Sequence, residues 1–108
     1  MNTLHTRLIS LLIDLEYEMR LAHLWSQEAP SAEAMASTEP FCVDTMPFPI
    51  WLQYIFIPRM HQLLVTQAPL PAHCDITTMA ETVWTNTPQA AAVIAVLRTF
   101  DEQINQPR

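Results

Sequence analysis

The sequence predicts an all-α protein: an antiparallel four-helix bundle with a kinked central helix and a long ordered loop after the first helix. Apolar residues recur at intervals of three and four over most of the chain, and this is the period at which one face of a helix repeats. Prolines precede or open the later apolar segments, at positions where an amide has no intrahelical partner. With 108 residues, the chain is expected to form one domain over residues 1–108.

The first helix is expected over residues 3–26 and carries two apolar stripes. A helix of this kind either lies between two neighbours or presents one side to a partner. The weaker stripe, which Arg20 interrupts, is therefore a candidate interface, and it consists of Ile9, Ile13, Tyr17 and Leu24. The stronger stripe is the predicted core face, and it consists of Leu4, Leu8, Leu11, Leu12, Leu15, Met19 and Ala22.

Residues 27–46 predict a long ordered loop with one helical turn near residues 32–36. The segment is rich in Ser, Ala, Thr and Glu and contains Pro30 and Pro40. A structureless loop of this length is uncommon inside a compact domain. We therefore expect Phe41 to pin the loop to the core.

The central helix is expected over residues 47–65. Pro47 and Pro49 suit a first turn, and the segment is apolar nearly all round, which is typical of a helix surrounded by others. Pro58 removes one backbone hydrogen bond from the interior and predicts a kink. Trp51, on this helix, is expected to belong to the core.

A short helix is expected from residue 77 or 78 to residue 84, and a last helix from Thr87 and Pro88 onward. The run of small residues at 90–95 would let another backbone approach closely. The core face of the last helix is expected to consist of Ala90, Val93, Ile94, Leu97, Phe100 and Ile104.

The composition excludes several kinds of active site. The chain contains no glycine, which removes the phosphate-binding loop, the dinucleotide fingerprint and the nucleophile elbow, because each needs a backbone conformation that glycine supplies. It also contains no lysine, so no Schiff base can form. We expect a non-enzymatic protein without a cofactor.

The charge balance bears on partners. The net charge is −6, and the five cations are arginines scattered singly along the sequence, whereas nucleic-acid binding draws on clustered Lys and Arg. Direct nucleic-acid binding is therefore disfavoured, and a protein partner or a homodimer is expected instead. No apolar run is long enough to span a membrane and the start of the chain lacks a basic signal segment, so a cytoplasmic location is expected.

No metal site is expected. Cys42 and Cys74 fit no zinc spacing, and a site built from them with His73 rests on no ligand pattern. Two free thiols that behave as small apolar residues are the simpler interpretation.

Arg59 is predicted to project from the apolar sector of the central helix. A buried guanidinium needs a partner, and Asp44 and Glu39 are the nearest carboxylates along the preceding loop. The favoured interpretation is a structural ion pair that ties the loop to the core. The alternative is an anion or partner contact in a pocket beside the Pro58 kink.

Five short segments in the middle of the chain form a distinctive combination: Ser37-Thr38-Glu39-Pro40-Phe41, Asp44-Thr45-Met46, Trp51-Leu52-Gln53, Ile57-Pro58-Arg59-Met60-His61 and Pro69-Leu70-Pro71. Together they resemble the signature of the YqcC family of small bacterial proteins. The departure is Pro47-Phe48-Pro49, where a single proline is expected.

The resemblance implies a helical bundle of unknown activity. It also implies that the gene often stands beside a gene for a tRNA pseudouridine synthase. That activity itself is not expected here, because such synthases use an aspartate in a much larger domain with a glycine-containing motif. The candidate structural or partner cluster, taken from the matching segments, is Glu39, Phe41, Asp44, Trp51, Pro58, Arg59, Met60 and His61.

Three functions follow from these observations. The first is a non-enzymatic interaction or accessory protein, linked to tRNA modification. The second is an RNA-binding accessory factor of a tRNA pseudouridine synthase, whose arginines converge only in the fold. The third is an enzyme of unfamiliar type that uses the region of Asp44, Arg59 and His61.

Overall fold

The computed structural model describes residues 3–107, and every regular element in that range is helical. The all-α class is thereby confirmed. Short 3₁₀ turns lie at Pro40–Cys42 and Pro88–Ala90, and a π-helical turn, η2, lies at Leu52–Phe56. The α-helices are α1 (Thr3–Leu21), α2 (Ala32–Met35), α3 (Phe48–Trp51), α4 (Ile57–Val65), α5 (Thr77–Val83) and α6 (Ala91–Asn105).

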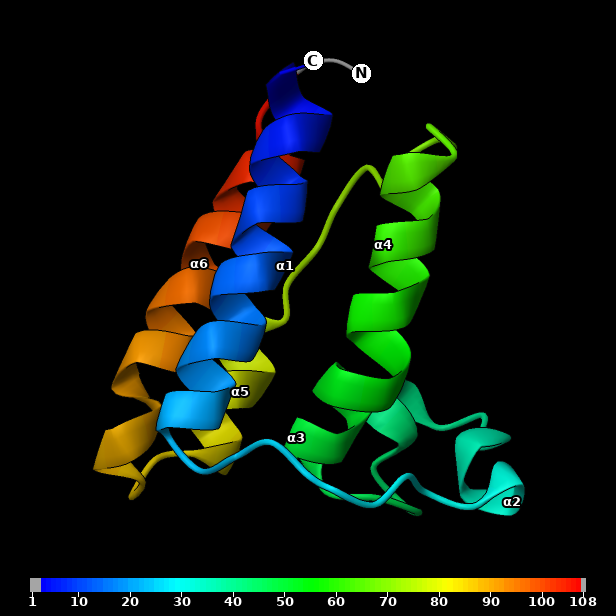
Figure 1. Ribbon diagram of the computed structural model, residues 1–108, viewed down its shortest axis with the longest axis vertical. Coiled ribbons are helices and arrows are strands. Elements are labelled where there is room, and N and C mark those ends of the chain that lie inside the picture. Colours follow the sequence, from blue (N-terminus) through cyan, green and yellow to red (C-terminus); the bar gives the residue numbers. More distant parts are fainter. Residues whose placement is uncertain (1–2, 108) are drawn as a thin grey trace.

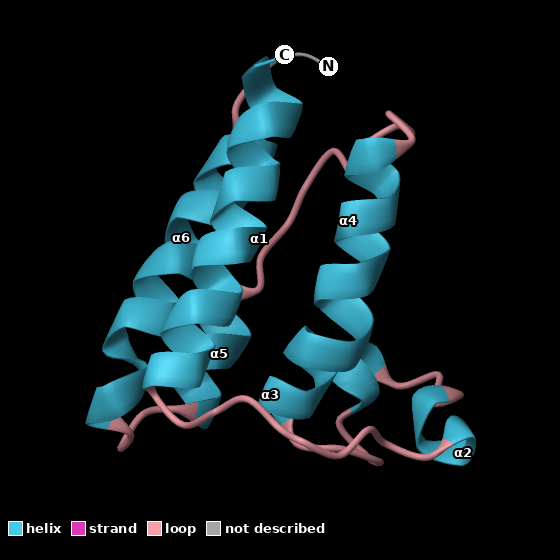
Figure 2. Ribbon diagram, viewed as in Figure 1, coloured by secondary structure: helices cyan, strands magenta, loops and turns pink. Residues whose placement is uncertain are grey.

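Three long rods make up the body of the molecule (Figure 1). Helices α1 and α6 lie side by side and antiparallel, and α1 also packs against α4. The third rod is the continuous run α3–η2–α4, and α5 is a short helix packed against α6. The expected antiparallel four-helix bundle describes this arrangement only coarsely, because an extended segment, residues 66–76, takes the place of a tight turn after α4 (Figure 2).

One main core joins these rods. Its largest fully buried side chains come from α1, η2, α4 and α6, as the helical periodicity predicts. Both predicted core faces contribute, with Leu4, Leu11 and Ile94 only partly buried at the margin. The largest fully buried side chains are Phe100, Leu8, Leu15, Met19, Leu52, Leu64, Leu97, Ile104 and Val93.

At Pro58, where the sequence predicts a kink, the structure has a π-helical turn directly before the proline. An α-helix would direct the proline ring against the carbonyl of Tyr54, four residues back. In the structure the amide of Ile57 instead donates to the carbonyl of Leu52, five residues back. The wider turn accommodates the proline and adds one residue to the helical phase.

Two helices end in a left-handed residue although the chain has no glycine. His23 follows α1 with φ 59° and Gln67 follows α4 with φ 54°. In each case the next amide donates back across the turn, Leu24 to Met19 and Ala68 to Leu63, which is the Schellman arrangement. The expected first helix is therefore five residues too long, because the chain leaves the helical path at His23.

The loop after α1 is ordered, and it contains the predicted helical turn as α2. The buried side-chain amide of Gln53 holds the start of the loop: its Oε1 accepts from the amide of Ser26 at 2.7 Å and its Nε2 donates to the carbonyl of Ser26 at 2.8 Å. The far end is fixed by Phe41, whose ring packs edge-on against Trp51 at 4.8 Å. The predicted pinning by Phe41 is confirmed.

None of the helices in the described range is both long enough and apolar enough to cross a membrane.

The left-handed residue after α4 gives a stability test with a matched control. Gln67→Gly should raise the free energy of unfolding by about 0.5–1 kcal/mol, because glycine adopts positive φ without a Cβ clash. Gln62→Gly, at an exposed position inside α4, should lower it by a similar amount. Thermal and urea unfolding measure both, and a loss of stability in Gln67→Gly would contradict the assignment.

Candidate functional site

The signature segments do not assemble into a single inward-facing cluster. Of the eight residues in the candidate cluster, only Met60 is buried, while Phe41 and Trp51 are half-buried. The polar members of the predicted cluster, together with Pro58, are exposed. These exposed residues are Glu39, Asp44, Pro58, Arg59 and His61.

The predicted burial of Arg59 is wrong, and the π-helical turn is the reason. From Leu52 an unbroken α-helix would bring Arg59 and Leu63 to the core face. The additional residue in the turn moves that face one position along the chain, so that Met60 and Leu64 are buried instead. Arg59 therefore points to solvent.

The predicted ion pair of Arg59 does not form either. Within residues 3–107, neither Asp44 nor Glu39 lies in salt-bridge range of the guanidinium. Asp44 instead accepts a hydrogen bond from the hydroxyl of Ser37, across the turn that leads into Pro40–Cys42. His61 is two residues beyond Arg59, so the two side chains leave the helix on different sides.

The aromatic members of the cluster have a structural role. Trp51 stacks on Phe48 at 5.9 Å and on Phe56 at 5.7 Å, and Phe41 packs edge-on against it. Contacts of this geometry stabilise beyond the area they bury. The row continues through Phe56 to Phe100, and it joins the loop to the main core.

The most highly connected polar group is Asp101, which the sequence analysis did not single out. Its carboxylate is buried on α6, and its Oδ2 accepts from the amide of Ile76 at 2.9 Å, the amide of Thr77 at 2.8 Å and the Thr77 hydroxyl at 2.6 Å. The carboxylate thereby satisfies donors at the start of α5. No described donor reaches Oδ1 in full hydrogen-bond geometry.

A second α6 side chain, one turn on, continues this attachment. Asn105 accepts from the amide of Cys74 and donates to its carbonyl, both at 2.7 Å. Asp101 and Asn105 lie four residues apart, so they share one face of α6. Together they fix the extended segment before α5 to the last helix, and a polar signal at this spacing could have been read from the sequence.

This environment makes Cys74 a poor nucleophile. Partial burial raises the pKa of its thiol well above the ordinary value, and the Asp101 carboxylate adds to the rise through a weak S–H contact and its negative charge. Because the thiolate is the reactive form, the thiol is held in its inert state. Cys42 is buried, and both cysteines are free.

The described residues contain no group of three or more His, Cys, Asp or Glu side chains that could hold a metal ion. His73 is exposed, and it precedes a half-buried Cys74. At this point Asn105 attaches the backbone of Cys74 to α6.

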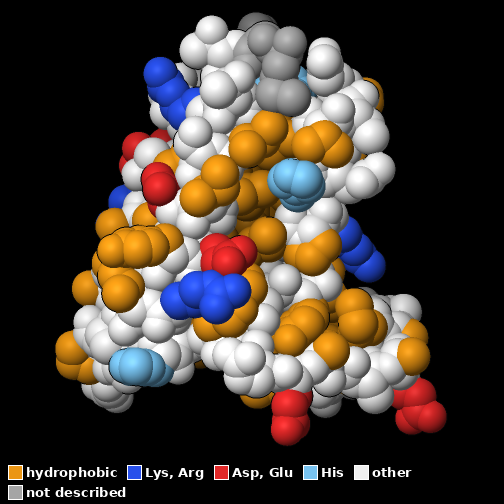
Figure 3. Space-filling model, in the orientation of Figure 1, with side chains coloured by type: hydrophobic (Ala, Val, Ile, Leu, Met, Phe, Trp, Pro, Cys, Tyr) orange, Lys and Arg blue, Asp and Glu red, His pale blue; other side chains and the backbone are white. Residues whose placement is uncertain are grey.

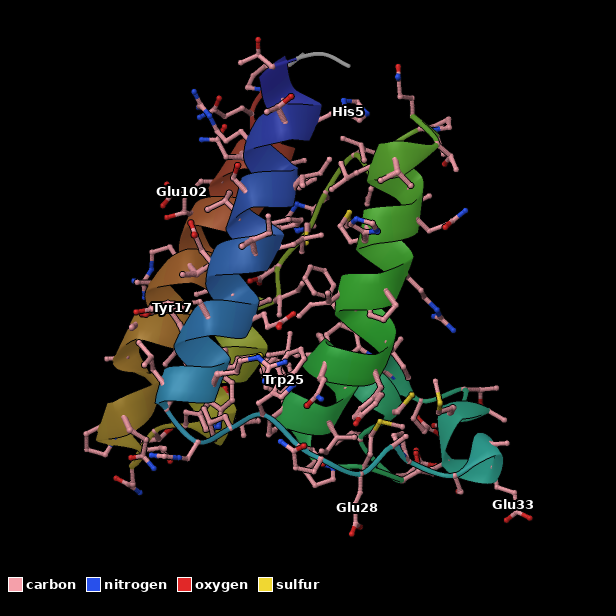
Figure 4. All side chains as sticks on the ribbon, viewed as in Figure 1. His5, Tyr17, Trp25, Glu28, Glu33 and Glu102 are labelled. Atoms are coloured by element: carbon pink, nitrogen blue, oxygen red, sulfur yellow. The ribbon has the colours of Figure 1, made fainter. Side chains whose placement is uncertain are left out.

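The outer face of the α1–α6 pair carries a row of exposed apolar side chains. Ile13, Tyr17 and Leu21 are 64%, 61% and 61% exposed, and they succeed one another at intervals of four along α1. Figure 3 shows hydrophobic side chains along this flank, and Figure 4 shows Tyr17 projecting from it. We call this row the α1 ridge.

A shallow hollow of about 440 Å³ lies beside the α1 ridge. It is open to solvent, and α1 and α6 contribute three side chains each. We call it the α1–α6 groove, and its lining consists of Asp14, Tyr17, Glu18, Ala92, Ala95 and Val96.

The four residues of the predicted interface stripe divide between the surface and the margin of the core. Ile13 and Tyr17 are exposed as expected, whereas Ile9 and Leu24 are partly buried against the main core. Leu24 leaves the stripe because α1 ends at Leu21 and the left-handed His23 turns the chain inward. Leu21 takes its position on the exposed side.

A further contact lies at the C-terminal end of α1. The guanidinium of Arg20 lies 4.8 Å from the centre of the Trp25 ring, a cation–π contact, and its Nε donates to Glu16 at 2.9 Å. Trp25 is half-buried between α1 and the third rod (Figure 4). The contact occupies Arg20 and anchors the tryptophan in the fold.

Comparison with known proteins places this architecture in a family. A family model described as tRNA pseudouridine synthase C matches residues 7–103. The uncharacterized protein YqcC of Escherichia coli (strain K12) is 37% identical over 100 residues, which are 92% of each chain. The chain belongs to the YqcC family. The resemblance found in the signature segments is thereby confirmed.

Two other proteins extend the comparison. An uncharacterized protein of Haemophilus influenzae is 35% identical over 91 residues, 84% of this chain and 86% of that one. A protein of Pectobacterium carotovorum subsp. carotovorum named tRNA pseudouridine synthase C is 47% identical over 60 residues, 56% of this chain. The matched segment makes up only 16% of that relative.

The solution NMR structure of protein YqcC from E. coli has the same fold. The two structures superimpose with a TM-score of 0.87 at 34% sequence identity, over 99% of this chain and 92% of that chain. The two proteins therefore share the arrangement of helices.

The role of Asp101 can be tested by truncation. Asp101→Ala should lower the free energy of unfolding by about 3 kcal/mol or more, because it leaves three buried donors at the start of α5 without an acceptor. Glu102→Ala, at the adjacent exposed position, should change it by less than about 0.5 kcal/mol. Urea unfolding followed by circular dichroism measures both, and equal effects would contradict the proposed attachment.

The raised pKa of Cys74 predicts a dependence of stability on pH. Above the ordinary thiol pKa of 9.0 the unfolded chain loses this proton while the folded chain retains it, so ionisation favours unfolding. The free energy of unfolding should therefore fall more steeply above pH 9 in the wild type than in Cys74→Ser. Parallel pH profiles of the two proteins, measured by urea unfolding, would contradict the assignment.

Proposed function

We propose that this protein is a non-catalytic accessory protein that binds a tRNA pseudouridine synthase. The observation that carries the proposal is the Pectobacterium relative, whose name is tRNA pseudouridine synthase C and of which the matching segment is a small part. A YqcC-like helical segment within a longer chain of that name supports a physical association between the two. A separate chain of the same family would form the association without a covalent link.

The placement of the candidate catalytic residues supports a role without catalysis. Asp44, Arg59 and His61 are all exposed, and Asp44 belongs to the loop while the other two leave α4 on different sides. Catalytic side chains need to converge within hydrogen-bond reach of one reacting atom. Polar groups do converge at the buried carboxylate of Asp101. They include backbone amides of the chain itself, those of Ile76 and Thr77, which donate hydrogen bonds to it.

The charges favour a protein partner over direct binding of tRNA. The net charge is −6, and Arg7 and Arg20 lie at opposite ends of α1, about 20 Å apart at 1.5 Å per residue. Arg59 is on α4 and Arg98 on α6, while Arg108 lies outside the described residues. An enzyme that binds tRNA must itself carry Lys and Arg for the phosphates, and such a surface attracts an acidic protein.

The proposal is tested by mixing the purified chain with the tRNA pseudouridine synthase C of the same organism. Sedimentation and calorimetry should show a defined complex with a Kd in the micromolar range or tighter, about −8 kcal/mol. Lack of complex formation at low salt and about 100 µM protein would contradict the proposal, since such an interaction is weaker than about −5.5 kcal/mol.

Two controls separate the alternative functions. Incubation of the chain alone with unmodified tRNA should yield no pseudouridine, and formation of pseudouridine would overturn the non-catalytic assignment. A gel shift with tRNA should show no complex even at low salt, where phosphate contacts are strongest. A shift that disappears as salt increases would favour an RNA-binding accessory factor instead.

A further inference from the structure

We propose that the α1–α6 groove is the docking site for the synthase, and that its occupant is an amphipathic helix with an apolar stripe flanked by Lys and Arg. This inference rests on the proposed function and identifies the surface and the chemistry of the partner segment. The groove is distinct from the signature segments, which lie on the loop after α1, on the third rod and in the extended segment after α4.

The apolar α1 ridge borders the site, and its middle residue, Tyr17, lines the groove. Ile13, Tyr17 and Leu21 repeat every four residues, so they form one row along the helix and not a scattered set. Exposed aromatic side chains such as Tyr17 are prominent among residues that dominate binding energies, because they offer a large area with few rotatable bonds. Other large exposed apolar residues of the described range stand on separate elements, namely Met35, Val43, Val65 and Val83.

The α6 wall is low, and this shape suits a helix. Ala92 and Ala95 line the groove and are exposed, so the backbone of α6 is accessible to a neighbouring element. Small residues permit helix axes to approach to about 8 Å, the close end of the usual range. The groove runs between two antiparallel helices, and a third helix laid in it would cover the ridge and the alanines together.

The negative charges at the groove favour an occupant that carries Lys or Arg on either side of its apolar stripe. Asp14 and Glu18 belong to the lining, and Glu102 projects from α6 on the same flank (Figure 4). The cations of α1 are engaged elsewhere, since Arg20 bonds Glu16 and Arg7 donates to Gln103 at 3.0 Å. A segment with Lys or Arg beside its apolar stripe would meet carboxylates that form no salt bridge within residues 3–107.

The same charges argue against two other occupants. A second copy of the chain in a two-fold interface would bring the identical face, with its own carboxylates, against this one. Like charges across an interface are costly. A tRNA would bring phosphates to the same carboxylates, which is equally unfavourable. A basic protein segment with an apolar stripe is the occupant that fits both the α1 ridge and the carboxylates at the α1–α6 groove.

The experiment measures binding of the same synthase to groove variants by calorimetry. Tyr17→Ser removes the aromatic of the ridge, and Ala95→Gln places a longer side chain in the groove; each should weaken binding at least 10-fold. The double variant Asp14→Lys, Glu18→Lys should also weaken binding, and its loss of affinity relative to the wild type should be larger at low salt than at high salt. Val43→Ser, an equally exposed apolar residue far along the chain, should bind as the wild type does.

All the substituted side chains are exposed or line the surface, so the variants should melt within a few degrees of the wild type, which thermal unfolding checks. Wild-type affinity in both Tyr17→Ser and Ala95→Gln would overturn the groove assignment while leaving the proposed function intact. No binding by the wild type would overturn the proposed function and, with it, this inference. Self-association of the wild type that Tyr17→Ser abolishes, without synthase binding, would assign the groove to a second copy and overturn the proposal.

Discussion

The π-helical turn at Leu52–Phe56 is the constraint on which the central part of the structure depends. Pro58 cannot continue an α-helix without a clash, and the wider turn resolves that clash by adding one residue. Every side chain beyond the turn is consequently rotated by one position. Met60 and Leu64 enter the core, and Arg59 is directed to solvent.

Two buried polar side chains complement this apolar core, and both act on backbone groups. Gln53 holds the loop after α1 through Ser26, and Asp101 holds the start of α5 through Ile76 and Thr77. Each is buried with hydrogen bonds that offset its desolvation. Hydrogen bonds thereby fix long irregular segments to the rods, while both cysteines are free.

The surface left by this packing is uneven in character. The loop side carries exposed polar residues of the family signature, whereas the α1–α6 side carries a ridge of apolar residues beside a low alanine wall. Large exposed apolar surfaces on soluble proteins commonly mark interaction sites. The acidic side chains beside this face are the basis on which the proposed function assigns it a basic protein partner.

The sequence by itself determined the helical class, the approximate helix positions, the loop pinned by Phe41 and the membership of the YqcC family, because these depend on local periodicity, on proline positions and on short contiguous segments. Tertiary structure alone decided which residues of the central helix face inward, because a one-residue change in helical phase depends on how the chain accommodates Pro58. It also decided that Asp101 binds α5 and that Leu21, not Leu24, completes the α1 ridge. Those outcomes arise from contacts between segments far apart in the chain and from left-handed turns at residues other than glycine. The spacing of Asp101 and Asn105 marks a polar face of α6, but local sequence does not show which segment that face binds.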